Sequence, residues 1–367
     1  MMNTSSSRQK RNPNMELLRI VAILMVTMLH ALGKGNLLGS LVQGATANTV
    51  AAWLLESLSI SAVNIFMLIS GYFLIKAEFK LARLIELVAQ IVFYTAGSFI
   101  VLRLLGIVPD AEMDMYWFLN YFLPVHMDVF WFMTAYLVIY ALTPALTKGL
   151  AALEQKNFLR MIVILLIYEC GFKSFLPFRM YTDSRGYSFL WCLIVFLIGA
   201  YIRLYGFKFL NSSSKGWLLY FVSCTLIFAE TFALEYANTV LGRLKEIGGA
   251  SMDYNHIFVL SAALGIFSAF VNSKPMGDAV GKVVCFISPM TLGVYLLQEN
   301  LTMRFRWTAW LKVNMAAGKS LPMFLLTVFG AAVGMFALGL VVDYIRIQLF
   351  KCVRRIPQLR NEKTEQN

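Results

Sequence analysis

The sequence predicts an all-α protein, a polytopic bundle of about ten transmembrane helices with both termini in the cytoplasm. Of its 367 residues, 59% are hydrophobic and only 14% are charged, and the mean hydropathy is +0.68. A soluble domain has about 25% charged residues, so this chain has too few charges to cover a water-facing surface. Apolar runs near the roughly 18–20 residues that span a bilayer recur along the chain, and basic residues are concentrated in every second connection.

The apolar runs define the predicted helices in chain order, and the connections between them are too short for a separate soluble domain. The predicted spans are 16–34, 57–75, 84–106, 128–147, 159–176, 188–205, 216–235, 256–273, 283–301 and 321–342. They form one predicted membrane domain over residues 14–345. A basic cytoplasmic segment (1–13) precedes it and a basic cytoplasmic tail (346–367) follows it.

The basic residues orient the predicted bundle. With the N-terminus inside, most of the 32 Lys and Arg residues fall in cytoplasmic segments, as the positive-inside rule requires, and the number of spans is even. This topology, in the lipid bilayer of the inner (cytoplasmic) cell membrane, accounts for the net charge of +12. Nucleic acid is therefore not expected as a partner. The outer connection 302–320 departs from the rule with four basic residues and no acidic one. It marks either a functional surface or a wrong span count.

The sequence indicates neither a cleaved signal peptide nor a disulfide or metal framework. The basic start followed by an apolar run has the outline of a signal peptide, but Glu16 and Arg19 interrupt the apolar core that such a peptide needs. The first run is therefore predicted to be a retained helix. The five cysteines show no CxxC spacing, so neither a disulfide framework nor a metal site is expected.

The first span carries two ionisable residues, each costly to insert at about 2.5–3.5 kcal/mol. Arg19 and His30 are eleven residues apart, which is about three helical turns, so both project from one face with about 16 Å between them along the axis. Glu16, one turn before Arg19, is placed to orient its guanidinium. This spacing predicts a groove that opens to the cytoplasm at Arg19 and ends at His30. The alternative is that Arg19 snorkels to the headgroups while His30 joins two helices by a hydrogen bond.

Polar residues also occur in the second and ninth predicted spans. Ser70 and Gly71 are either part of the groove or a small-residue contact between helices. Gln298 and Glu299 end the ninth span, where exposure at the headgroups is the alternative to a functional role.

Two outer loops are rich in aromatic residues. One contains Trp117 and Tyr121, and the other contains Arg179, Asp183 and Arg185 among aromatic neighbours. Interfacial aromatic belts are common in membrane proteins. The functional interpretation is a sugar-binding rim, in which rings stack on a pyranose and the charged groups bind its hydroxyls.

Together these residues resemble the acyltransferase family 3, integral-membrane acyltransferases that modify bacterial surface polysaccharides. The signatures are Arg19 with His30, the run from Ile65 to Leu74, the run from Trp131 to Pro144, and the run from Val294 to Asn300. The resemblance covers residues from about 14 to 345. Gln298 stands where the family motif has a histidine, which leaves open any role for a second imidazole there. The chain resembles the stand-alone form of the family, without a fused extracytoplasmic domain.

The resemblance implies an acyl-CoA co-substrate, usually acetyl-CoA, rather than a tightly bound cofactor, and an acceptor hydroxyl on a glycan or glycolipid. It implies that His30 is catalytic, with Glu299 as the next candidate, and that Arg19, Glu16 and Ser70 bind the donor. Two alternatives remain: a transporter or flippase with Arg19 and His30 along its path, and a polysaccharide polymerase that uses Arg179 and Arg185.

Overall fold

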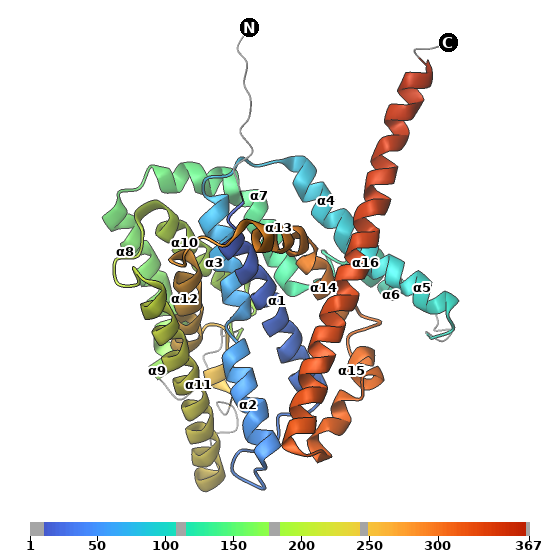
Figure 1. Cartoon of the computed structure of the whole chain (residues 1–367). Coiled ribbons are helices and arrows are strands. Elements are labelled where there is room, and N and C mark those ends of the chain that lie inside the picture. The colour runs from blue at the N-terminus through green and yellow to red at the C-terminus, as the bar shows by residue number, and fades with distance from the viewer. Residues whose placement is uncertain (1–10, 108–114, 176–183, 243–248, 365–367) are drawn as a thin grey trace.

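The structure is a computed structural model, and it describes residues 11–107, 115–175, 184–242 and 249–364. These residues form helices and connecting loops and contain no strand (Figure 1). Seven helical segments of the described chain are long and apolar enough to cross a membrane, and α10 is a shorter apolar helix. The structure therefore confirms the predicted class, an all-α bundle with several membrane-spanning helices. The number of spans and the side of the termini stay predictions.

Each predicted span overlaps one helix or a run of consecutive helices. The α-helices are α1 (Pro13–Lys34), α2 (Ala47–Ser59), α3 (Ala62–Leu74), α4 (Leu81–Val92), α5 (Ser98–Leu104), α6 (Met115–Phe122), α7 (Trp131–Ala151), α8 (Gln155–Leu166), α9 (Phe172–Phe175), α10 (Phe189–Tyr205), α11 (Ser213–Leu241), α12 (Ile257–Val271), α13 (Asp278–Ile287), α14 (Thr291–Gln298), α15 (Arg306–Trp310) and α16 (Leu321–Thr364). Short π or 3₁₀ turns connect several of them: η1 (Phe93–Gly97), η2 (Ile167–Gly171), η3 (Ala250–Met252), η4 (Ser288–Met290) and η5 (Val313–Gly318).

The second span is longer than predicted and is broken in the middle. The prediction began at residue 57, whereas the segment Ala47–Leu74 consists of α2 followed by α3. The break frees backbone groups that a continuous helix would pair, and in an apolar environment these need other partners. Tyr220 on α11 donates its hydroxyl hydrogen to the carbonyl of Leu58 at 2.6 Å, so a neighbouring helix satisfies one of them.

The ninth span is also interrupted, at Pro289. Proline lacks an N–H group and disrupts the interior of an α-helix, and here the chain makes one 3₁₀ turn, η4, between α13 and α14. This turn places Ser288 against α1, where it takes part in the site described below.

Glycines allow two pairs of helices to approach closely. A Cβ atom added at Gly71 on α3 would lie 1.9 Å from the carbonyl oxygen of Phe196 on α10, and one at Gly199 would lie 2.3 Å from that of Leu68. The α11–α12 pair is similar, because a Cβ at Gly216 would lie 2.4 Å from the nitrogen of Ala269. Small residues at helix crossings are typical of membrane bundles.

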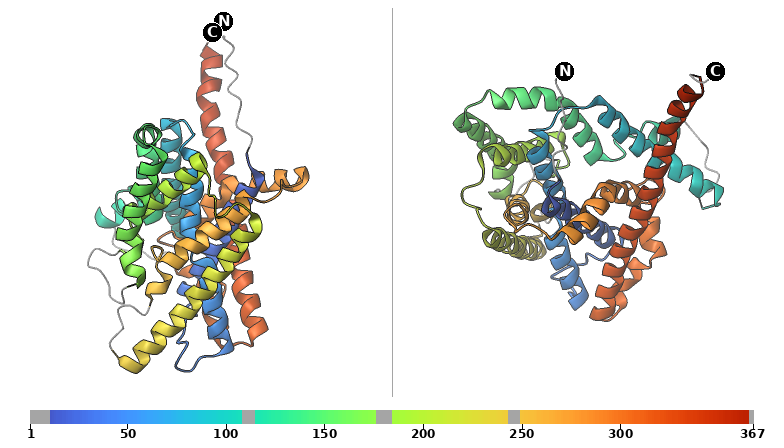
Figure 2. Two further views of the ribbon diagram at one scale, coloured as in Figure 1. Left: turned by 90° about the vertical axis from the view of Figure 1, so that its left-hand side faces the viewer. Right: turned by 45° about the horizontal axis from the view of Figure 1, so that its top comes forward.

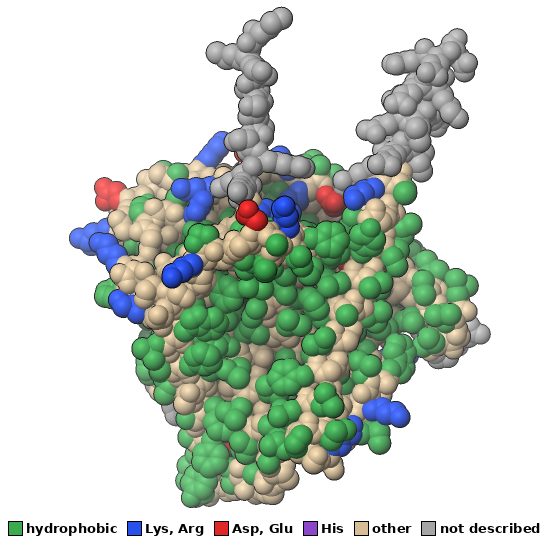
Figure 3. All heavy atoms as spheres, in the orientation of Figure 1, with side chains coloured by type: hydrophobic (Ala, Val, Ile, Leu, Met, Phe, Trp, Pro, Cys, Tyr) green, Lys and Arg blue, Asp and Glu red, His purple; other side chains and the backbone are tan. Residues whose placement is uncertain are grey.

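Helix α1 lies in the middle of the bundle, in contact with α2, α3, α13, α14 and α16. The end of the molecule where α1 begins is also the end towards which α16 runs (Figures 1 and 2). On the face shown in Figure 3, Lys and Arg side chains gather mainly at this end, and apolar side chains cover most of the remainder. We call it the basic end. Helix α16 continues without a break through residues 345 and 346, so the predicted domain boundary there lies inside a helix.

Candidate active site

A cavity of about 810 Å³ lies inside the bundle, within the size range of small-molecule and cofactor sites. Five basic residues line it toward the basic end: Arg11, Arg19, Arg83, Arg346 and Lys351. His30 and Glu299 line it about three turns of α1 further in. Aromatic side chains form much of the wall between, including Phe66, Trp131, Phe132, Tyr254 and Tyr295. The groove predicted from the first span therefore corresponds to a real cavity that contains both Arg19 and His30.

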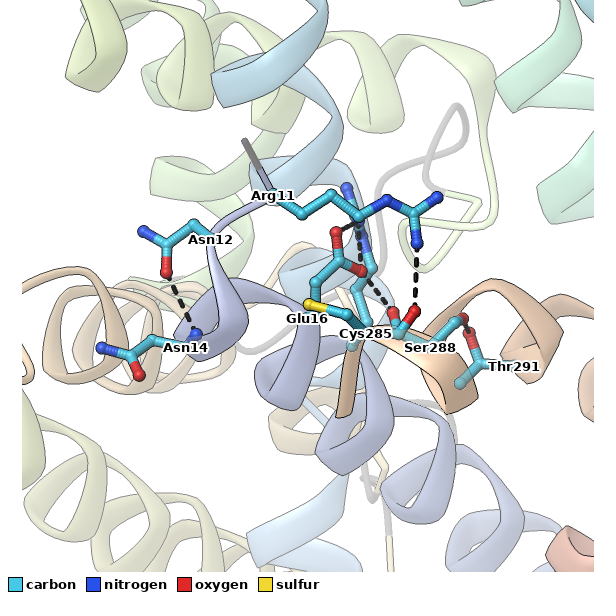
Figure 4. Close-up of polar contacts among 8 residues, drawn as sticks. Arg11, Asn12, Asn14, Glu16, Cys285, Ser288 and Thr291 are labelled. Atoms are coloured by element: carbon cyan, nitrogen blue, oxygen red, sulfur yellow. Dashed lines mark hydrogen bonds and ion pairs between the residues drawn. The ribbon is translucent and has the colours of Figure 1, made fainter. Parts of the chain in front are cut away.

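Arg19 is held at the basic end by Glu16, one turn earlier on α1. Its Nη1 atom lies 2.8 Å from each carboxylate oxygen of Glu16, as the i, i+3 spacing predicted. Glu16 is buried and also accepts a hydrogen bond from the hydroxyl of Ser288 on η4 (Figure 4). The guanidinium lies 5.4 Å from the centre of the Phe73 ring. Arg19 is thus fixed by groups from α1, α3 and η4, with about a third of its side chain exposed.

Arg11 fixes the start of α1 at the same place. Its Nη1 atom donates a hydrogen bond to the backbone carbonyl of Cys285 on α13 at 3.1 Å (Figure 4). The side chain of Asn12 caps the helix by accepting a hydrogen bond from the backbone nitrogen of Asn14 at 3.0 Å. The basic end of the cavity is therefore built on anchored helix ends.

His30 lies against Glu299, which ends α14. The Nδ1 atom of His30 is 3.3 Å from Oε1 of Glu299. This is an ion-pair distance for a protonated imidazole, although neither atom makes a hydrogen bond with any described residue, and it leaves Nε2 on the side of the ring away from the carboxylate. A base that is oriented by a third group is a common arrangement in group-transfer enzymes.

Glu299 is also shared by two cations. Lys34, one turn after His30 on α1, forms an ion pair with Oε1 of Glu299, and Nε of Arg304 lies 3.5 Å from Oε2. The Nη2 atom of Arg304 donates to the carbonyl of Val129 at 3.1 Å. Arg304 belongs to the connection 302–320, whose excess of basic residues did not fit the charge rule. At least one of those residues has a partner in the site.

Ser70 and Gln298 have different positions relative to the cavity. Ser70 lines it, and its hydroxyl donates to the carbonyl of Phe66 at 2.7 Å. Gln298, which stands where the family motif has a histidine, is fully buried and is not among the lining residues.

Two of the residues predicted to bind the acceptor, Trp117 and Tyr121, lie away from the cavity. Trp117 and Tyr121 pack against Phe99, with ring centroids 4.2 Å and 4.8 Å away, and neither lines the cavity. Arg179 and Asp183 lie outside the described residues.

Arg185 is nearer to the cavity than Trp117 or Tyr121. Its backbone oxygen accepts a hydrogen bond from the nitrogen of Tyr254 at 3.1 Å, and Tyr254 lines the cavity. Tyr187 packs against both Trp131 and Tyr254, with centroids 4.7 Å and 4.8 Å away. This aromatic group, rather than Trp117 and Tyr121, adjoins the site.

Several polar residues at or beside the cavity were not predicted from the sequence: Lys34, Ser288, Arg304, Asp343 and Arg346. The pair Asp343–Arg346 repeats the i, i+3 spacing of Glu16–Arg19, and that repetition was a usable signal. The predicted last span ends at residue 342, which separates Asp343 and Arg346 from the helix that carries them both.

The fold and the cavity define a polytopic membrane protein with an internal polar site. The chain belongs to the acyltransferase family 3: the family model described as an acyltransferase domain matches residues 12–344, which is nearly the whole chain. It is therefore a membrane acyltransferase, as the resemblance in its motifs predicted. No match was found among curated proteins or among solved structures.

Proposed function

We propose that this protein transfers an acyl group, in the simplest case acetyl, from cytoplasmic acyl-CoA to a hydroxyl of an exported polysaccharide or its lipid-linked precursor. On this proposal it crosses the inner membrane about ten times, with the basic end in the cytoplasm. The observation that carries the proposal is that one cavity contains an anchored arginine cluster and, about three turns further in, the His30–Glu299 pair. Family membership favours this function over a transporter or a polymerase.

The basic end has the chemistry of a donor site. Coenzyme A carries phosphates at one end and its reactive thioester at the other. Planar guanidinium groups bind phosphate oxygens through paired hydrogen bonds, and Arg19 is already oriented by Glu16. Phosphates bound there would leave the flexible arm to extend between the aromatic walls toward His30.

The far end has the chemistry of a general base. On this proposal Nε2 of His30 takes the proton of the acceptor hydroxyl as its oxygen attacks the thioester carbonyl. The C–O bond forms and the C–S bond breaks, and the proton passes to the departing CoA sulfur. General-base catalysis contributes about 10²–10⁴-fold to the rate. A route in which His30 first accepts the acyl group on Nε2 uses the same residues.

The acceptor would approach His30 past the aromatic wall. Trp131 and Tyr254 line the cavity and lie nearly parallel, with an interplanar angle of 22° and centroids 5.9 Å apart. Such faces suit the apolar face of a sugar ring. This supports a carbohydrate acceptor, in agreement with the substrates that the family resemblance implies.

The test uses purified full-length protein in lipid nanodiscs with acetyl-CoA labelled in the acetyl group. We expect release of free CoA thiol and transfer of label to an added lipid-linked or soluble glycan acceptor. A transporter would move its ligand without consuming the thioester, so intact acetyl-CoA in the presence of acceptors would contradict the proposal. Mass spectrometry of surface glycans from cells with and without the gene would identify the acyl group and the sugar.

A further inference from the structure

A second arginine with its own buried carboxylate lines the cavity from α16. Arg346 on α16 is 5% exposed and lines the cavity. Its Nε and Nη2 atoms lie 2.9 Å and 2.8 Å from the two carboxylate oxygens of Asp343, a two-point pair that fixes the plane of the guanidinium. Neither residue belongs to the motifs that carried the family resemblance.

Asp343 is in turn held from a different helix. It is fully buried, and its Oδ1 atom accepts hydrogen bonds from Nε2 of Gln90 and from the hydroxyl of Tyr94, each at 3.0 Å. A Cβ atom at Gly293 would lie 2.4 Å from that hydroxyl and 2.5 Å from Asp343, so α14 closes over the network. Four donors from three side chains thus surround one carboxylate, which leaves Arg346 little freedom to move.

The guanidinium has capacity left for a ligand. An arginine side chain has five N–H donors, and Asp343 takes only those on one edge, through Nε and Nη2. Asp343 does not contact the other edge of the guanidinium, and Arg346 lines the cavity. Burying a charge is costly. A purely structural contact between α4 and α16 could use neutral hydrogen-bonding groups and would not need a cation beside an open cavity.

Arg346 and Arg19 lie at similar depth. Asp343 adjoins Gly293, and Arg346 is about one helical turn nearer the basic end. Ser288, which contacts Glu16, belongs to η4, the turn that precedes α14 and Gly293. The two guanidinium groups therefore face the same part of the cavity from α1 and from α16, each oriented by a carboxylate three residues earlier in its own helix.

We propose that Arg346, positioned by Asp343, is the second phosphate-binding guanidinium of the donor site and forms with Arg19 a two-sided clamp for the phosphates of acyl-CoA. This rests on the proposed function. Asp343 is a positioning residue, and its partners Gln90 and Tyr94 support it. The shared chemistry is a phosphate ester or diphosphate, which a lipid headgroup could also supply, so the test has to separate the two sources.

The test compares donors with and without phosphates in full-length protein in phosphatidylcholine nanodiscs. Arg346→Lys keeps the positive charge beside Asp343 but loses the planar fork. We expect it to raise the KM for acetyl-CoA by about tenfold or more, to leave kcat near the wild-type value, and to leave kcat/KM for acetyl-pantetheine unchanged, because that donor has no phosphates. Arg160→Ala on α8, an exposed arginine that does not line the cavity, is the matched control and should behave as wild type with both donors.

A double variant covers the case in which Arg346→Lys folds poorly. Asp343→Asn with Arg346→Gln removes both charges but retains polar groups of similar shape, and it should show the same selective rise in KM. Asp343→Asn alone should also raise the KM for acetyl-CoA. The rise in the double variant should be smaller than the product of the rises caused by Asp343→Asn and Arg346→Gln singly, because both substitutions act through one guanidinium.

The outcomes separate this proposal from the proposed function. Folded variants that turn over acetyl-CoA with an unchanged KM would overturn the role of Arg346 and leave the acyltransferase function intact. Variants with an unchanged KM that lose stability only in phosphatidylglycerol nanodiscs would show that the site holds a lipid phosphate instead. Wild-type protein that neither binds CoA nor consumes acetyl-CoA would overturn the proposed function itself.

Discussion

The guanidinium of Arg19 is fixed by Glu16 and by the Phe73 ring before any ligand arrives. We predict that Arg19→Lys raises the KM for acetyl-CoA, because an ammonium has no planar fork for phosphate, and that Arg19→Ala raises it further. Thermal unfolding should change little, since the side chain is partly exposed and Glu16 keeps its bond to Ser288. The KM for acetyl-CoA is the measurement, with Arg160→Ala as control. Equal KM values in wild type and Arg19→Ala would remove Arg19 from the donor site.

Glu299 lies beside His30 and forms ion pairs with Lys34 and Arg304. Glu299→Gln keeps the shape but removes the charge. We predict a fall in kcat of about tenfold or more, with little change in the KM for acetyl-CoA because the proposed phosphate site is at the basic end. A purely structural role would instead lower the amount of folded protein and leave kcat per folded molecule unchanged.

The residues that sequence could assign are those whose relation is set within one helix. Arg19 and His30 could be placed on one face because the helical period is fixed, and the structure places both at one cavity. The contacts of Glu299 with Lys34, and of Asp343 with Tyr94, join distant parts of the chain. No local pattern determines such contacts.

At the scale of elements, the close crossing of α3 and α10 holds the wall that carries Ser70. We predict that Gly71→Ala lowers stability by about 1–3 kcal/mol, the usual cost of overpacking, because its Cβ would meet the Phe196 carbonyl oxygen at 1.9 Å. Gly330→Ala on α16 is the control, since a Cβ there meets no atom within 4 Å, and alanine favours a helix. Thermal unfolding in detergent measures both. Similar melting temperatures for wild type and Gly71→Ala would contradict the packing described.

Sequence predicted where the helices lie better than where they break. Hydropathy located the second span but not its early start at Ala47 or its break before α3. The reason is that the break is satisfied by Tyr220, a residue from a distant helix. Pro289, by contrast, could have signalled the interruption between α13 and α14, because its effect on a helix is local.

At the scale of the whole molecule, the distribution of charge predicts which end faces the cytoplasm. In a variant without native cysteines, we predict that a cysteine introduced at Ala152 is not labelled in intact cells by an impermeant thiol reagent, whereas one at Gln43 is. Both positions are exposed. Residue 43 lies between α1 and α2, and residue 152 lies between α7 and α8. Labelling at 152 and not at 43 would reverse the orientation and place the basic end outside.

The central claim is that acyl transfer occurs at His30, and His30→Gln tests it most directly. The amide can keep a packing hydrogen bond but cannot take up a proton near neutral pH. The measurement is transfer of labelled acetyl to the glycan acceptor by purified wild-type and variant proteins, matched for folded amount. The account predicts a variant that inserts and folds but transfers at less than about a hundredth of the wild-type rate, in line with loss of a general base. A folded variant that retains more than about a tenth of that rate would make His30 a structural residue and would contradict the account.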